Sequence, residues 1–300
     1  MDINESVIVV GGLARNCEYN LCRNLDEIEK LRPYVKELYI CILENDSTDN
    51  TPQIMDRFCS SHKNVKVVHF KETQFDVSAV SGASMSRICR LTKYRNMLLD
   101  MMRSCTNDAD FDVIIDYDLD ELNSLQIIKA IENAPVEWGA LFADGRYKWQ
   151  YRDKIQTAFR DKRKLYDSFA ILESNRRIES IISFDNCSLA KFKKAVAFGT
   201  LLNKERFIPC RSAFGGVGIY KHEVLVGCKY STFKVGDFYV CEHIYLNNSI
   251  AEKGYMNYIT SELKTCVLMQ QDNIFSYYFN KYLPLIHDLM VSLYLRLKHN

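Results

Sequence analysis

The chain has 300 residues, of which 47% are hydrophobic, and it balances 39 lysines and arginines against 38 aspartates and glutamates. This length is sufficient for one large domain or two small ones with a substantial core. A net charge of +1 excludes the strongly basic surface that most nucleic-acid-binding proteins use. We therefore expect an ordinary globular protein with no nucleic-acid partner.

The cysteines number 11, an odd count, and they include no C-x-x-C pair. This pattern predicts neither a disulfide framework nor a zinc site, and it favours reduced thiols in a cytosol-like compartment. The N-terminus lacks a basic region followed by a long apolar run, and no stretch approaches the roughly eighteen apolar residues of a membrane span. These features predict a cytoplasmic protein without a signal peptide.

Short apolar runs rich in β-branched residues predict buried strands at 6–10, 37–43, 65–70 and 111–115. Gly11 and Gly12 predict a tight turn after the first strand. Helical spacing of apolar residues predicts helices at 24–36 and 86–103, and a helix capped by Ser47 or Thr48 after the polar turn at 44–52. This alternation is typical of a mainly parallel α/β sheet flanked by helices.

Four carboxylates follow the fourth predicted strand, namely Asp116, Asp118, Asp120 and Glu121. In open α/β sheets ligands bind beyond the carboxyl ends of the strands, and clustered carboxylates suit Mg²⁺ or Mn²⁺ holding a diphosphate. The alternative is a solvated acidic turn, which an isolated D-x-D pattern would favour.

Polar residues also follow the first two predicted strands. Arg15 could contact a nucleotide or serve in a turn, and Glu44, Asn45 and Asp46 could accept hydrogen bonds from a base or ribose or cap the next helix. Among the basic residues of the 86–103 helix, we expect most to be solvated and Arg95 to reach a phosphate.

The second half contains a predicted helix at 123–134 and a basic, aromatic stretch at 146–177. Because the chain is neutral, we interpret this stretch as a platform for an acceptor sugar rather than for single-stranded nucleic acid. The alternative for most of these residues is a mixture of core aromatics and solvated charges. Gly215 and Gly216 could wall a donor sugar and an acceptor, or they could form the start of a strand or a bulge.

Several motifs in order along the chain resemble those of glycosyltransferases with the GT-A fold, in particular the family-2-like group related to capsule and surface-glycan enzymes. They lie at 43–51, 94–96, 115–118, 142–145, 166–170, 212–220 and 241–243. The resemblance implies a GT-A-like fold and a nucleotide-sugar donor, UDP- or GDP-linked. It further implies transfer of a hexose or deoxyhexose to a hydroxyl of a glycan or lipid-linked acceptor.

The resemblance also assigns roles to individual residues. Asp116 and Asp118 match the metal motif, and the departure at Asp120 and Glu121 leaves the register of the ligands open. Glu242 matches the general base, which implies an inverting reaction. His243 stands where such enzymes more often have Asp; it could be a third metal ligand, steer Glu242, or be a buried histidine.

We predict one GT-A-like domain over residues 1–265, with donor and metal contacts at 6–121 and acceptor contacts at 138–260. A helical extension is predicted over residues 266–300. It could dock on the domain, join two copies of the chain, or contact a membrane peripherally.

Two other functions use the same residues. In a haloacid-dehalogenase-like phosphohydrolase, Asp116 would be the nucleophile and Asp118 the acid. In a glycan-binding module without catalytic activity, the carboxylates would need no metal.

Overall fold

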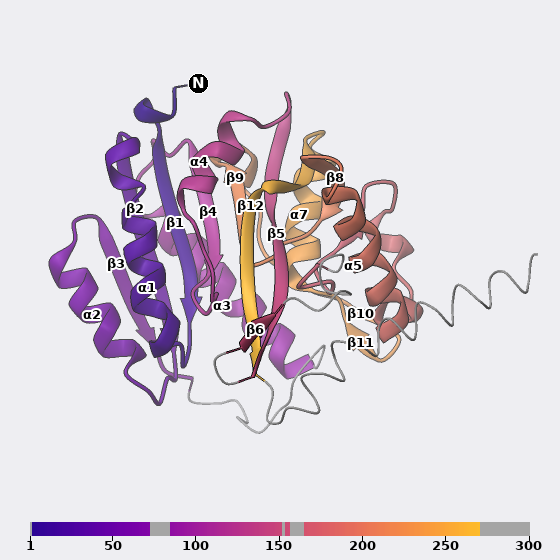
Figure 1. Ribbon diagram of the computed structural model, residues 1–300, viewed down its shortest axis with the longest axis horizontal. Helices are drawn as coiled ribbons and strands as arrows, with labels where there is room; N and C mark the ends of the chain where they lie inside the picture. The colour runs from indigo at the N-terminus through magenta and orange to yellow at the C-terminus, as the bar shows by residue number, and fades with distance from the viewer. Residues whose placement is uncertain (1, 73–84, 152–153, 157–164, 271–300) are drawn as a thin grey trace, which may run out of the picture.

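The computed structural model describes residues 2–72, 85–151, 154–156 and 165–270. A ten-stranded sheet runs through this part of the chain in the order β3-β2-β1-β4-β9-β5-β12-β8-β7, with β6 beside β5 (Figure 1). Its strands are β1 (Val7–Ala14), β2 (Glu37–Asn45), β3 (Val65–Phe70), β4 (Phe111–Asp116), β5 (Trp138–Tyr151), β6 (Lys154–Gln156), β7 (Leu172–Glu173), β8 (Phe207–Ser212), β9 (Val217–Lys221) and β12 (Met256–Gln270). A separate hairpin pairs β10 (Lys234–Val235) with β11 (Phe238–Tyr239).

Most strands of this sheet point the same way. The neighbours β3, β2, β1 and β4 are all parallel, and β5 and β12 are parallel to each other. The strands β6, β8 and β9 run against their neighbours. The structure thus confirms the predicted fold class, a mainly parallel α/β sheet flanked by helices.

Helices cover both faces of the sheet. They are α1 (Glu18–Glu29), α2 (Thr51–Ser61), α3 (Met85–Arg103), α4 (Leu125–Glu132), α5 (Ser188–Leu202), α6 (His222–Leu225) and α7 (Glu242–Glu252). Four short 3₁₀ turns complete the elements: η1 (Ile3–Glu5), η2 (Arg32–Tyr34), η3 (Ile178–Ser180) and η4 (Ser183–Asn186).

Alternate residues of the central strands feed two separate hydrophobic clusters. Val9 of β1 packs in the cluster that contains α3, α5 and α7, whereas its neighbours Ile8 and Val10 pack in the cluster that contains α1, α2 and α4. This is the period-2 alternation of a sheet covered on both sides. The C-terminal ends of β1, β2 and β4 therefore meet at one edge of a rigid layer.

The structure corrects the predicted turn at Gly11 and Gly12. Both residues lie inside β1, paired with β2 and β4. A Cβ on Gly11 would lie 2.3 Å from the sulfur of Met102, and one on Gly12 would lie 2.5 Å from the ring of Tyr117. Glycine is needed here because neighbouring groups approach the strand closely, not because the chain turns.

Two helix predictions are also corrected. The helix predicted at 24–36 is α1 followed by η2, and Pro33 lies in the first positions of that 3₁₀ turn, where it lacks an N–H to continue the helix. Helix α2 is preceded by Asn50, not by Ser47 or Thr48 as its N-cap. Ser47 instead uses its hydroxyl to accept a hydrogen bond from the N–H of Asn16.

The C-terminal part begins in the sheet. Strand β12 continues to Gln270, so the predicted boundary at 265 lies within a strand, and the rest of the predicted extension, 271–300, lies outside the described residues. None of the helices in the described part of the chain is both long enough and apolar enough to span a bilayer. All 11 cysteines of the sequence have free thiols.

Candidate active site

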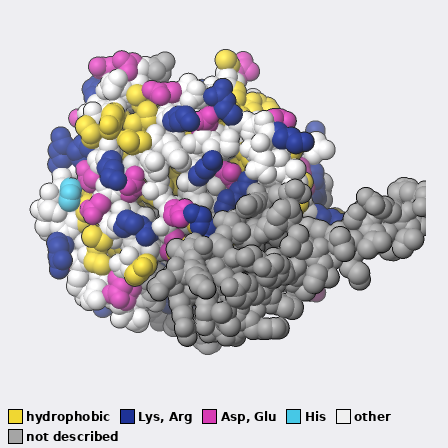
Figure 2. All heavy atoms as spheres, viewed as in Figure 1, with side chains coloured by type: hydrophobic (Ala, Val, Ile, Leu, Met, Phe, Trp, Pro, Cys, Tyr) yellow, Lys and Arg dark blue, Asp and Glu magenta, His cyan; other side chains and the backbone are white. Residues whose placement is uncertain are grey.

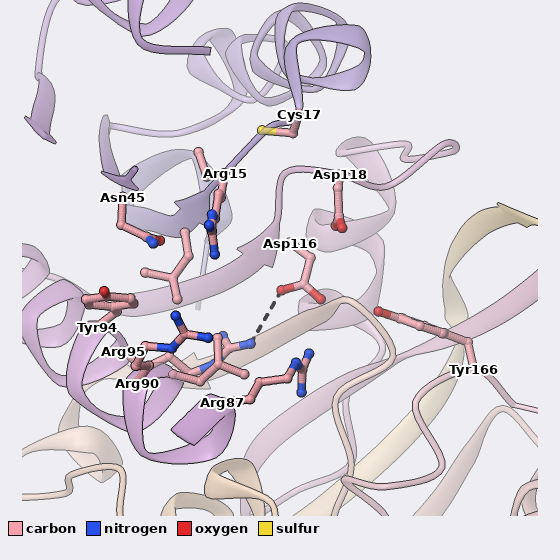
Figure 3. Close-up of a pocket in the computed structure, with 13 residues that line it drawn as sticks. Arg15, Cys17, Asn45, Arg87, Arg90, Tyr94, Arg95, Asp116, Asp118 and Tyr166 are labelled. Atoms are coloured by element: carbon pink, nitrogen blue, oxygen red, sulfur yellow. Dashed lines mark ion pairs between the residues drawn. The ribbon is translucent and has the colours of Figure 1, made fainter. Parts of the chain in front are cut away.

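A cavity of about 450 Å³ opens at the C-terminal ends of β1, β2 and β4 (Figure 3). The strand register sets this arrangement, because Leu13 pairs with Asp116 and Ala14 pairs with Glu44. Helix α3 forms a further wall. The lining residues are Leu13, Ala14, Arg15, Cys17, Asn45, Arg87, Arg90, Leu91, Tyr94, Arg95, Asp116, Asp118 and Tyr166.

Helix α1 fixes the loop that carries Asp118. The amide nitrogen of Asn24, fully buried, donates to the carbonyls of Tyr117 and Leu119 at 2.9 and 2.8 Å. The side chain of Asn20 donates to the carbonyl of Asp118 at 2.8 Å. These amides satisfy backbone oxygens that the strand can no longer pair. The sequence offers one weak signal of this role, an Asn on the apolar face of α1.

Asp116 and Asp118, which the sequence predicts as metal ligands, both line the cavity. Asp116 is the last residue of β4, and the side chain of Asp118 is exposed. Burial raises the pKa of Asp116 to about 7, with a further contribution from Asp118 against the opposing effect of Arg95. Desolvation by the surrounding cavity walls also raises the pKa of Asp118. The cavity therefore brings two carboxyl groups together at the end of β4.

Asp120 and Glu121 form contacts outside the cavity. This bears on the question, left open by the sequence, of which of the four carboxylates could bind a metal. An oxygen of Asp120 accepts from the N–H of Leu268 at 2.6 Å, and Glu121 pairs with Lys148 at 2.5 Å. Neither lines the cavity. These two carboxylates tie the loop to the end of β12, so the geometry favours Asp116 and Asp118 as the chemically available pair.

Arg95 connects the two halves of the chain. Its Nε donates to Oε1 of Glu242 at 2.9 Å, and its Nη2 lies 3.5 Å from Oδ1 of Asp116 (Figure 3). Burial alone would lower the pKa of Arg95, but Glu242 and Asp116 raise it above its ordinary value. The guanidinium thus stays charged next to the cavity.

Glu242 and His243 lie behind this arginine. Glu242 is the first residue of α7, its side chain is 3% exposed, and it does not line the cavity. His243 stacks on Phe214 with 4.0 Å between ring centroids, and burial together with Arg95 holds its pKa well below the ordinary value. Among the described residues, no group of three or more His, Cys, Asp or Glu is placed to bind a metal, so the structure does not bring His243 to the two aspartates.

The predicted donor contacts after β2 separate into two groups. Asn45 lines the cavity, together with Arg15 from the end of β1. Glu44 is buried and holds its own turn, since it accepts from the N–H of Ser47 at 2.6 Å and contacts His69 at 3.1 Å. Asp46 adopts a left-handed φ of 49° and accepts from the N–H of Glu72.

Gly215 and Gly216 support the site without lining it. The carbonyl of Gly216 accepts from the N–H of Asp116 at 2.9 Å, and the carbonyl of Gly215 accepts from the hydroxyl of Thr265 at 2.5 Å. Both have left-handed φ values, 63° and 89°. Their position agrees with the second interpretation of the sequence, the start of a strand, because β9 begins directly after Gly216.

The sequence assigned no individual role at the cavity to Arg87, Arg90 or Asp167, and it included Tyr166 only within the aromatic stretch and the 166–170 motif. Arg87 and Arg90, expected to be solvated, line the cavity from α3, and Tyr166 lines it from the segment after β6. Asp167 lies beside them with a left-handed φ of 54°, and burial, together with Asp116 and Glu242, raises its pKa to about 8. Arg87 and Arg90 lie on the face of α3 that points toward the strand ends, and their spacing along the helix was the sequence signal that could have identified them as cavity residues.

The cavity residues fit a divalent cation that is shared with a ligand. Asp118 offers exposed carboxylate oxygens beside Asp116. Mg²⁺ is commonly held by one or two carboxylates plus substrate phosphates, rather than by a cage made of protein alone. The arginines of the cavity wall suit the phosphates of such a ligand.

Residues 6–85 match the family described as Glycosyl transferase family 2. The matched segment is less than half of the chain. It covers β1, β2 and β3 and reaches the start of α3, so the predicted resemblance to family-2-like enzymes with the GT-A fold is confirmed. The family-2 match gives no support to the phosphohydrolase alternative. No curated protein matches the chain.

Several solved glycosyltransferases are similar to this chain at low identity. The mannosyltransferase PcManGT from Pyrobaculum calidifontis, in complex with GDP-Man and Mn²⁺, gives a TM-score of 0.46 at 14% identity, covering 95% of this chain and 64% of that one. Residues 1–349 of S. aureus TarS give 0.45 at 13% identity, covering 87% and 60%. Glucosyl-3-phosphoglycerate synthase from Mycobacterium tuberculosis, with UDP, gives 0.38 at 13% identity, covering 90% and 72%. This chain thus spans less than two thirds of the length of the first two proteins.

Proposed function

We propose that this protein is a glycosyltransferase that moves a sugar from a nucleotide-sugar donor to an acceptor hydroxyl, with a divalent cation at Asp116 and Asp118. One observation carries the proposal: the two aspartates at the end of β4 line one cavity together with Arg15, Asn45 and Arg95. The family-2 match over residues 6–85 supports the same function.

The proposed roles follow from charge and position. Arg15 and Asn45 bind the nucleoside side of the donor. Arg95 stays protonated and faces the diphosphate, whose developing negative charge is the main barrier to leaving. A divalent cation supplies Lewis-acid stabilisation of the same charge when it is bound.

For Glu242 we propose a positioning role first. Its Oε1 holds Nε of Arg95, which fixes the guanidinium toward Asp116. The predicted role as general base would require an acceptor hydroxyl to reach Oε2, whose neighbour is the thiol of Cys241 at 3.7 Å. Inversion at the anomeric carbon stays a prediction, which NMR analysis of the product anomer would test.

The proposal is tested by thermal unfolding with UDP or GDP, with and without Mn²⁺. A nucleotide that binds the native state raises the melting temperature. We expect stabilisation that requires Mn²⁺ in the wild type and its loss in Asp118→Asn. Glu121→Gln is the matched control, because this nearby carboxylate pairs with Lys148 outside the cavity. Equal stabilisation of Asp118→Asn and the wild type would contradict the assignment.

The domain division, a cytoplasmic location, contact with a membrane and association of copies stay proposals as well.

A further inference from the structure

Two cysteine side chains from distant parts of the chain are in contact where the end of α3 packs on β2. Cys41 lies in the middle of β2, and Cys105 follows α3, which ends at Arg103. Their sulfurs are 3.2 Å apart, and both thiols are free. A disulfide can form only between cysteine side chains that point toward each other at short range. The packing of α3 on β2 provides this arrangement.

The two thiols differ in their access to solvent. Cys41 is fully buried in the hydrophobic cluster that contains α3, whereas Cys105 packs at the edge of this cluster and is partly exposed. A dissolved oxidant can therefore reach Cys105 but not Cys41. Access thus dictates an order in which Cys105 reacts first and Cys41 second.

Hydrogen bonding and charge favour the thiolate form of the accessible cysteine. A hydrogen bond from the thiol of Cys41 lowers the pKa of Cys105, and Lys66 lowers it further, against the opposing effects of burial and Asp112. The sheet places Lys66 here, because this residue of β3 pairs with Cys41 of β2, and its Nζ donates to Oγ of Ser104 at 2.7 Å. The thiolate is the nucleophilic form of cysteine, so the sulfur that an oxidant can reach is also the more reactive one.

We propose that Cys41 and Cys105 form a reversible oxidation site that reacts with a hydroperoxide. The Cys105 thiolate attacks the peroxide, the O–O bond breaks, and the departing oxygen takes up a proton to give water or an alcohol. The Cys41 sulfur then attacks the sulfenic acid on Cys105, and its proton leaves with the displaced oxygen as water. Two thiols have then lost two electrons to the peroxide and become a disulfide, which an external dithiol opens by exchange.

This oxidation site is separate from the candidate active site. Neither Cys41 nor Cys105 lines the cavity. The bond would nevertheless join two elements that supply cavity residues, since Asn45 ends β2 and Arg95 lies on α3. The proposal rests on the thiol pair alone and stands or falls independently of the glycosyltransferase function.

The test is oxidation of the reduced full chain with equimolar hydrogen peroxide, followed by alkylation of the remaining thiols. Mass spectrometry of a non-reduced digest should show two peptides linked through Cys41 and Cys105, which dithiothreitol separates. Cys22→Ser is the control and should form the same link, because Cys22 is exposed and its sulfur lies 4.0 Å from a carboxylate oxygen of Asp26. Absence of the linked pair, or linkage of other cysteines to an equal extent, would overturn the proposal.

Two variants separate the steps of the reaction. Cys105→Ser should form no link. Cys41→Ala should accumulate the sulfenic acid on Cys105, which dimedone labels, because the thiol that displaces it is missing. Labelling should be slower than disulfide formation in the wild type, since the hydrogen bond from Cys41 is lost as well.

Circular dichroism checks that each variant is folded, and Cys41→Val makes the same deletion if alanine leaves too large a space in the core. A folded Cys41 variant without label on Cys105 would overturn the assigned order. Oxidation of Cys41 in Cys105→Ser as fast as the wild type forms its disulfide would overturn it too.

Discussion

Arg95 illustrates how a single side chain organises the candidate site. Its guanidinium is almost fully buried and contacts Glu242 from α7 and Asp116 from β4. A buried charge is tolerated only when it is paired, and removing one partner of such a pair is strongly destabilising. The residue therefore matters for stability as well as for the proposed chemistry.

Arg95→Lys should lower the free energy of unfolding by about 2–3 kcal/mol, because an ammonium cannot hold both carboxylates in the geometry of a planar guanidinium. Urea denaturation followed by circular dichroism measures this. The exposed Arg57 provides the control, and Arg57→Lys should change stability by less than about 0.5 kcal/mol. Equal effects of the two changes would show that the buried pair contributes no stability.

A second residue-scale pair predicts a pH effect away from the cavity. Nδ1 of His222 lies 2.7 Å from an oxygen of buried Asp112. The hydrogen bond to Asp112 raises the pKa of His222 above its ordinary value, against the opposing effect of burial. Since the folded state binds this proton more tightly, the stabilisation is fully present below the unfolded pKa of about 6.5. It is lost as the pH rises through the higher folded value.

The urea midpoint of the wild type should therefore fall relative to that of His222→Gln as the pH is raised from 6 to 9. The comparison between the two proteins isolates His222 from His69, whose pKa is also raised because Asp56 and Glu44 outweigh its burial. Parallel pH profiles for the two proteins would exclude the proposed linkage.

At the scale of elements, the turn before β9 connects the carboxylate strand to the rest of the sheet. The carbonyls of Gly215 and Gly216 bind Thr265 and the backbone of Asp116. A Cβ on Gly215 would lie 2.2 Å from the carbonyl oxygen of Ala143. Strand β5, which contains Ala143, and the turn at Gly215 can approach each other this closely only because position 215 has no side chain.

Gly215→Ala should cost about 2–4 kcal/mol of stability, because it adds a backbone clash to the strain of a left-handed φ. Gly227→Ala is a matched control: Gly227 also has a left-handed φ, 75°, but a Cβ there would meet nothing within 4 Å. The control should cost only about 1 kcal/mol. Chemical denaturation of both variants gives the difference, and similar losses would mean that backbone strain alone is responsible.

At the scale of the whole molecule, one sheet joins the segment that matches the family-2 model to the second half of the chain. Strand β9 lies between β4 and β5, and Arg95 links α3 to α7. Figure 2 shows charged side chains of both signs interspersed over the face in view, with no large patch of a single sign among the described residues that are visible there. The halves therefore share one sheet and one hydrophobic cluster.

Thermal unfolding should accordingly show one cooperative transition, and a bound nucleoside diphosphate with Mn²⁺ should move the whole transition upward. Differential scanning calorimetry measures both properties. Two transitions, with only one shifted by the nucleotide, would indicate that the donor part and the acceptor part unfold independently.

The sequence was informative wherever a local pattern is sufficient. The apolar run before Asp116 predicted β4, the run at 65–70 predicted β3, and helical spacing predicted α3 to within one residue. The sequence was less reliable where contacts with residues far away in the chain determine the local conformation. Gly11 and Gly12 suggested a turn because the sequence does not reveal that Met102 and Tyr117 pack against them in the middle of a strand.

The sequence by itself determined the alternation of strands and helices and the placing of Asp116 and Asp118 at a strand end, because hydrophobic period and chain order are local properties. Only the tertiary structure decided which charges share the cavity. It turned Arg87 and Arg90 inward, used Asp120 and Glu121 to hold the loop, and buried His243 against Phe214. Such choices depend on which elements pack together, and residues far apart in sequence set that packing.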